Sequence, residues 1–116
     1  MMQLDELTND AKFLLSVMYK QYISDRKSGH TKREAKFFGS EIRIHDTLMS
    51  EWEQDDVHET INELSRNKLL DVIYGNDEAA IVNLSTNAIV LMEHKFQDKV
   101  YSILNYATKI KTLITF

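Results

Sequence analysis

The stretch that decides the fold is LLDVIYGNDEAAIVNL, from Leu69 to Leu84. It contains two apolar runs, residues 69–74 and 79–84, separated by the polar tetrapeptide Gly75-Asn76-Asp77-Glu78. Short apolar runs that flank a Gly- and Asn-containing turn are typical of a β-hairpin. The sequence therefore predicts one antiparallel hairpin.

Helical patterns precede the hairpin. Thr8 is a plausible N-cap for a helix that runs to about Lys27, because apolar residues recur there at steps of three and four. A capping box formed by Thr31 and Glu34 predicts a second, short helix with a basic outer face. We expect this helix to bury Ala35 and Phe38 on one face and to end at Gly39.

Two further segments lie between Gly39 and the hairpin. SEIRIHDTLMSEW, from Ser40, fits a helix with Ile42, His45, Leu48 and Met49 on one side, although EIRI is equally compatible with a short strand. The next predicted helix spans residues 54–67 and buries Val57, Ile61 and Leu64. Glu53 is a weak N-cap for it, since Ser, Thr, Asp and Asn are the preferred caps.

A last helix follows the hairpin, with Ser85 or Thr86 as its cap. Apolar residues recur at helical spacing up to the C-terminus, so the sequence predicts an extended helix over residues 86–115, with a continuous run of about 28 residues or about 42 Å. This stripe could close the core against the first helix. It also offers more apolar surface than one small domain can bury, so we expect a homodimer whose candidate interface residues are Phe96, Val100, Ile103, Leu104, Ala107, Ile110 and Ile114.

Composition sets the limits of the fold and of the chemistry. The chain has 116 residues, 43% hydrophobic and 28% charged, which is ordinary for one globular domain. It has no cysteine, no run of eighteen apolar residues and no apolar leader, so we expect no disulfide, no membrane span and a cytoplasmic location.

Charge is unevenly distributed along the chain. Residues 12–43 contain eight basic and three acidic side chains, whereas residues 46–78 contain ten acidic and two basic ones. Such polarity indicates either surfaces for different partners or two regions that attract each other within one fold.

Catalysis has little support in the sequence. The four histidines, at positions 30, 45, 58 and 94, show no metal-binding spacing, and neither a phosphate-binding Gly-rich loop nor a G-x-S-x-G motif is present. We therefore expect a protein without catalytic residues, cofactor or metal.

The order of the predicted elements, helices followed by a hairpin and a long helix, is typical of a winged helix-turn-helix. We expect an α+β, mainly α fold with a two- or three-stranded wing, in one domain spanning residues 1–116. The phrases LTNDAKFLLSVMYKQYISDRKSGHTKREAKFFGS, EWEQDDVHETINELSRNKLL and LSTNAIVLMEHKF resemble a family of small phage and prophage proteins of Gram-positive bacteria, similar in outline to the YjcQ-like winged-helix proteins. The resemblance covers most of the chain and implies the fold and a phage setting inside a bacterial host cell, with no active site.

Double-stranded DNA is the first candidate partner. A winged helix of this type implies a DNA-associated or regulatory module acting as a dimer, and the candidate contacts are Lys27, Lys32, Arg33, Lys36, Arg43, Asn62, Arg66 and Lys68. The helix of residues 54–67 also carries carboxylates that would repel phosphates. An alternative is therefore a protein-interaction module, such as an inhibitor of a host factor, that uses Asp55, Asp56, Glu59 and Glu63.

Overall fold

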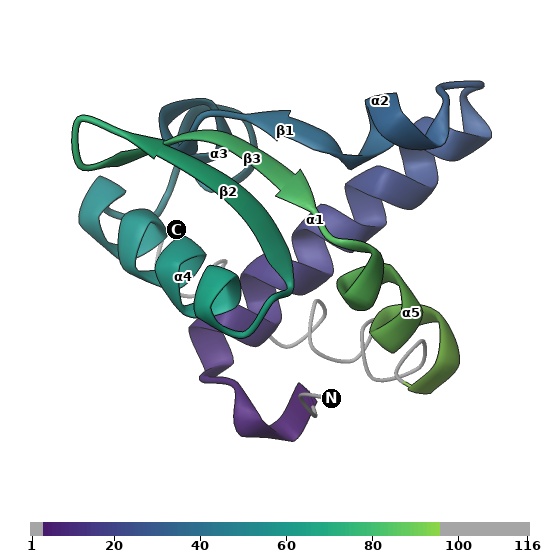
Figure 1. The fold of residues 1–116 in the computed structure, drawn as a ribbon, viewed down its shortest axis with the longest axis horizontal. Helices are drawn as coiled ribbons and strands as arrows, with labels where there is room; N and C mark the ends of the chain where they lie inside the picture. The colour runs from purple at the N-terminus through teal and green to yellow at the C-terminus, as the bar shows by residue number, and fades with distance from the viewer. Residues whose placement is uncertain (1–3, 96–116) are drawn as a thin grey trace.

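The computed structural model describes residues 4–95 of the chain. Their fold is α+β and mainly helical, with one three-stranded antiparallel sheet (Figure 1). After a 3₁₀ turn at Leu4–Glu6, the elements are α1 (Asn9–Lys27), α2 (Lys32–Lys36), β1 (Phe37–Gly39), α3 (Glu41–Leu48), α4 (Gln54–Arg66), β2 (Leu70–Gly75), β3 (Glu78–Leu84) and α5 (Thr86–Lys95).

The predicted hairpin is confirmed. Strands β2 and β3 pair antiparallel, with Leu70 opposite Leu84 and Ile73 opposite Ile81. The connecting residues Asn76 and Asp77 have φ of 54° and 64°, the left-handed conformation that a tight two-residue hairpin turn requires. The turn is therefore shorter than the four polar residues suggested, because Gly75 and Glu78 already pair with each other.

A third strand replaces part of the expected second helix. Helix α2 ends at Lys36 rather than at Gly39, and residues 37–39 form β1, which pairs with β3. Phe38 is buried as predicted, but it reaches the core from a strand instead of a helical face. The reason is a long-range partner: Phe37 lies opposite Asn83 and Gly39 opposite Val82, and no local pattern could show this.

The capping predictions explain where the helices begin. Thr8 Oγ1 accepts a hydrogen bond from Ala11 N at 3.2 Å, and the Thr31–Glu34 capping box is complete. Ser40 Oγ accepts from Arg43 N at 3.1 Å, which makes EIRI the start of helix α3 and not a strand. Glu53 makes no side-chain capping bond, in agreement with its weak capping preference.

The helical stripe expected for the segment after Ser40 is wrong in part. Ile44 is fully buried and Met49 is almost so, whereas Ile42 is 46% exposed. Helix α3 is only eight residues long, and its one buried apolar side chain is that of Ile44. The buried face therefore differs from the predicted one, which carried Ile42 and His45.

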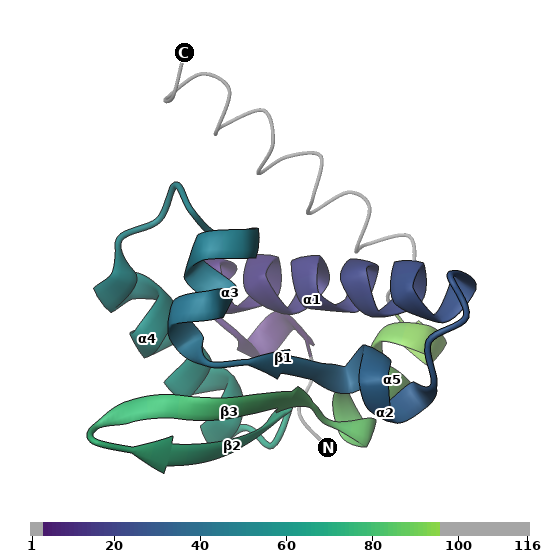
Figure 2. The same cartoon turned by 90° about the horizontal axis from the view of Figure 1, so that it is seen from above.

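The core lies between the sheet, α1 and α4. Leu14, Leu15 and Met18 of α1 meet Val57, Ile61 and Leu64 of α4, and all of them are completely buried. Burial of each such side chain contributes about 1.5–3 kcal/mol, so this contact supplies much of the stabilisation. The other face of the sheet carries the exposed side chains Phe37, Ile73 and Ile81, and Figures 1 and 2 show no described element over it.

The last described helix is capped by Ser85, the first of the two predicted candidates. Its Oγ accepts from Ala88 N at 3.0 Å, and α5 runs from Thr86 to Lys95. The rest of the predicted helix and all of its candidate dimer residues, Phe96 to Ile114, lie outside the described residues. Within residues 4–95, no helix has both the length and the apolar run needed to cross a bilayer.

Candidate binding surfaces

Basic side chains gather where α1 ends and α2 begins. Lys27, Lys32 and Arg33 are exposed there, and Lys36 Nζ donates to Thr86 Oγ1 at 3.1 Å. The one acid on α2, Glu34, accepts from Thr31 N at 2.8 Å, and this backbone hydrogen bond lowers the pKa of its carboxyl group. We call the residues Arg26, Lys27, Lys32, Arg33 and Lys36 the basic end.

The remaining candidate DNA contacts lie elsewhere. Arg43 projects from α3, where its side chain lies over Gly39, and Asn62 and Arg66 belong to α4. Lys68 follows α4 with φ of 61°. The structure therefore divides the predicted set among several elements and brings only the first four members together.

Acidic side chains gather at the opposite end of the molecule. Asp55, Asp56 and Glu59 on the first half of α4 are exposed, and so are Asp77 and Glu78 at the hairpin tip; we call these five residues the acidic end. Figures 1 and 2 both place the start of α4 and the hairpin tip far from α2. No ion pair joins the two ends within residues 4–95, so the internal attraction that the charge pattern allowed is not found between these groups.

Glu63, the fourth predicted acidic contact, has a structural partner. Its carboxylate accepts from Thr8 N at 2.9 Å and from Thr8 Oγ1 at 2.6 Å. A carboxylate at the N-terminus of α1 also interacts favourably with the positive end of that helix. Glu63 therefore joins α4 to α1 and is less available to a partner than Asp55, Asp56 or Glu59.

A buried carboxylate that sequence reasoning missed sits at the start of α3. Glu41 is only 3% exposed, and its Oε1 accepts from Ala79 N at 2.6 Å and from His58 Nδ1 at 2.8 Å. Its Oε2 accepts from Gln54 Nε2 at 3.1 Å. Burial alone would raise the pKa of Glu41, but these hydrogen bonds outweigh it, and the net pKa lies below its ordinary value.

The Glu41 contact continues into a polar chain that reaches the hairpin. His58 Nε2 lies 3.2 Å from Asn62 Nδ2, and Tyr74 Oη donates to Asn62 Oδ1 at 2.7 Å. The hydrogen bond to Glu41 raises the pKa of His58. This chain fixes the distance between α4 and the hairpin, and it occupies Asn62, one of the predicted base-reading side chains.

His45 forms a second polar junction. Its Nδ1 lies 2.8 Å from Asp46 Oδ1, and its Nε2 lies 2.8 Å from the carbonyl oxygen of Trp52. Both partners are acceptors, so the doubly protonated ring satisfies both, and the Asp46 carboxylate raises the pKa of His45. The indole of Trp52 in turn stacks on Phe13 with ring centroids 5.8 Å apart, which ties this loop to α1.

These shifts predict how stability depends on pH. The pKa values of His45 and His58 are raised in the folded state, so their stabilisation is complete below about pH 6.5 and is lost as the pH rises through the folded values. The pKa of Glu41 is lowered, so its contribution is lost as the pH falls through its folded value. Urea unfolding should therefore give a maximum between these limits.

His45→Gln and His58→Gln should each flatten the alkaline side of this profile. A wild-type free energy of unfolding that rises steadily from pH 6 to 8 would contradict the assignment.

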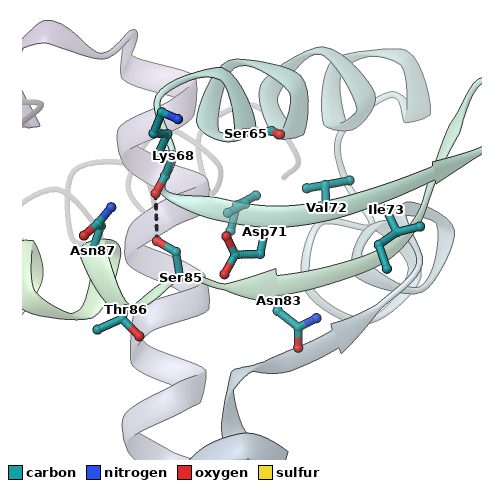
Figure 3. Close-up of a pocket in the computed structure, with 10 residues that line it drawn as sticks. Ser65, Lys68, Asp71, Val72, Ile73, Asn83, Ser85, Thr86 and Asn87 are labelled. Atoms are coloured by element: carbon teal, nitrogen blue, oxygen red, sulfur yellow. Dashed lines mark hydrogen bonds between the residues drawn. The ribbon is translucent and has the colours of Figure 1, made fainter.

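Two open grooves follow β2. The first, of about 570 Å³, is lined by residues 70–73, with Ser65 and Lys68 on one side and Asn83 and residues 85–87 on another (Figure 3). The second, of about 580 Å³, is lined by Tyr74 and the tip residues 75–77, together with His58, Asn62 and Arg66 of α4. In the described part of the chain, no group of three His, Asp or Glu side chains is placed to hold a metal ion.

No protein-family model, curated protein or solved structure matches this chain. The assignment of function must therefore come from the arrangement of the described residues. Their main feature is the separation of a basic end from an acidic end by the length of the molecule.

Proposed function

We propose that this chain is a non-enzymatic, winged-helix DNA-associated module that contacts duplex phosphates with its basic end. Support for the winged-helix assignment comes from topology. The order α1, α2, β1, α3, α4, β2, β3, with sheet order β1-β3-β2, places two consecutive helices, α3 and α4, before a hairpin that flanks α4. In this assignment α3 and α4 form the helix-turn-helix and the β2–β3 hairpin is the wing.

The observation that supports DNA as the partner is the basic end. Its cationic side chains lie at the end of α1 and on α2. None of them forms an ion pair with the acidic end. Lysine and arginine side chains in such a group neutralise phosphates and release counterions, which supplies affinity without base recognition.

The acidic end is the reason that we expect DNA binding without specificity for a base sequence. The outer side of α4 carries Asp55 and Glu59, and the wing tip carries Asp77, so the surface that winged helices insert into the major groove would be repelled by phosphates. Binding through the basic end keeps these carboxylates away from the duplex. We therefore expect contacts to the DNA backbone rather than to base edges.

A salt titration tests this proposal. With a duplex of mixed sequence, the logarithm of the observed binding constant should fall linearly with the logarithm of salt concentration, at a slope of about −0.9 for each phosphate neutralised. Three to five contacts correspond to a slope between about −3 and −5. Fluorescence anisotropy in a salt series measures it, and absence of binding at about 50 mM salt would contradict the proposal.

A second candidate function, a protein-interaction module, is favoured by the composition of the acidic end. Exposed carboxylates there adjoin the exposed apolar side chains Ile73 and Tyr74 of the wing. Protein interfaces usually have charged groups around an apolar centre. A partner with a basic surface would complement the charge of the acidic end.

The variant Asp55→Asn/Asp56→Asn/Glu59→Gln separates the two functions. It removes three charges from the acidic end and leaves the basic end intact, so DNA affinity should stay equal or increase. Capture of a host protein should be lost if the acidic end is its binding surface. A purified partner that binds this variant and the wild type equally would exclude the second candidate.

A further inference from the structure

Among residues 4–95, the sheet has a free edge at β2. Its order is β1-β3-β2, so within this part of the chain β2 is hydrogen bonded on one side only, along the six residues Leu70–Gly75. Ser85 N donates to the carbonyl oxygen of Leu69 at 3.1 Å, and this bond together with the register fixes the alternation of the ladder. The backbone groups of Asp71 and Ile73 therefore point to β3, and those of Val72 point to the open edge. The register shifts between Ile73 and Tyr74, but Gly75 pairs with Glu78 beyond the shift, so the backbone groups of Tyr74 also point outward.

Space for another strand lies along this edge. The two grooves follow each other along β2. The first is lined by residues 70–73 together with Asn83 of β3 and the end of α4, and the second by residues 74–77 together with α4. Consecutive residues of a strand point to opposite faces, so a groove lined by four in succession includes the strand's edge and not one face alone. Figure 3 shows Asp71 and Ile73 on one face of the sheet and Val72 on the other.

We propose that the free edge of β2 binds β2 of a second copy of the chain, antiparallel, with the twofold axis at Ile73. The two three-stranded sheets would then become one six-stranded sheet. This association is independent of DNA binding and of the interface predicted for the C-terminal helix.

The exposed side chains select this register over its neighbours. With the axis at Ile73, Val72 lies opposite Tyr74′ with outward backbone groups in register, and Ile73 lies opposite Ile73′. Ile73 is 61% exposed and Ile81, its partner within the hairpin, is 38% exposed. The pairing gives a continuous row Ile81–Ile73–Ile73′–Ile81′ across the outer face, which covers the most exposed large apolar side chain among the described residues.

Charge and packing disfavour the neighbouring axes. An axis at Asp71 would place two aspartates directly opposite each other, which is unfavourable. An axis at Val72 would place Ile73 against Asp71′ and leave the isoleucine row incomplete.

A single cysteine tests the geometry. The 116 residues contain no cysteine, so Ile73→Cys in this chain introduces a single thiol. Residues opposite each other in a non-hydrogen-bonded antiparallel pair have Cα atoms about 4.5 Å apart, within the range that a disulfide spans. We expect mild oxidation to give a covalent dimer on a non-reducing gel.

Ile42→Cys is the matched control, because Ile42 is also an exposed isoleucine, on α3 and away from the sheet edge. It should cross-link at least tenfold more slowly than the Ile73→Cys variant. Equal cross-linking of the two variants, or none at position 73, would overturn the proposal.

Sedimentation equilibrium provides a second test that does not depend on oxidation. Ile73→Lys should weaken self-association at least tenfold, because it places two like charges directly opposite each other at the twofold axis. Ile42→Lys, which adds the same charge on α3, should leave self-association unchanged. A wild-type chain that is monomeric at about 1 mM, or a dimer unaffected by Ile73→Lys, would contradict the β2 interface.

Discussion

Replacement of Glu41 by alanine should lower the free energy of unfolding by about 3 kcal/mol. The substitution leaves Ala79 N, His58 Nδ1 and Gln54 Nε2 without their shared acceptor. Ala79 N is buried with that carboxylate, so water does not readily replace the lost bond, and the cost of an unpaired buried donor is larger than the net value of an ordinary hydrogen bond. Urea unfolding followed by circular dichroism measures the change.

Two variants make the interpretation specific. Glu41→Gln keeps one carbonyl acceptor but no charge and should lose about half as much stability. Glu59→Ala removes an exposed carboxylate from α4 and should change the free energy of unfolding by less than about 0.5 kcal/mol. A loss below about 1 kcal/mol for Glu41→Ala would show that the hairpin is held by its apolar contacts alone.

The variant Lys32→Glu/Arg33→Glu/Lys36→Glu should bind duplex DNA at least about a hundredfold more weakly at low salt. Each reversal removes one phosphate contact and adds one repulsion, so the salt slope should also become shallower by about 2.7. Anisotropy titrations at two salt concentrations give both quantities. Unchanged unfolding in urea would show that the loss reflects the surface and not the fold.

A matched control keeps the same change in net charge. Lys20→Glu/Arg43→Glu/Arg66→Glu reverses three cations that lie on α1, α3 and α4, outside the basic end. It should weaken binding far less, through long-range repulsion that salt screens. Equal losses in the two variants would indicate a response to net charge and would remove the basic end as the binding surface.

Much of the architecture could be predicted because its signals are local. The Thr31–Glu34 capping box, the Thr8 cap and the Asn76-Asp77 turn each depend on residues within a few positions of one another. Helices α1 and α4 were predicted from the spacing of apolar residues such as Val57, Ile61 and Leu64, which fixes the buried face without knowledge of the partner.

Features that depend on distant partners could not be predicted in this way. Strand β1 forms because Phe37 and Gly39 meet β3 more than forty positions away, and Glu41 is buried because Ala79 and His58 surround it. The sequence places Glu63 among the acidic contacts, whereas in the structure its carboxylate accepts two hydrogen bonds from Thr8. The sequence predicts the clustering of the basic residues at positions 27, 32, 33 and 36, because they are close along the chain. It does not show that Arg43, Arg66 and Lys68 lie elsewhere in the fold, outside this cluster.

The most direct test of the account is to map which backbone amides respond when duplex DNA is added to the isotopically labelled protein at low salt. We expect the largest shifts in NMR spectra at residues 26–36, on the last turn of α1 and on α2, with little change at residues 55–59 and 76–78. Largest shifts on α4 and the hairpin tip, or no shifts at all, would contradict DNA binding through the basic end.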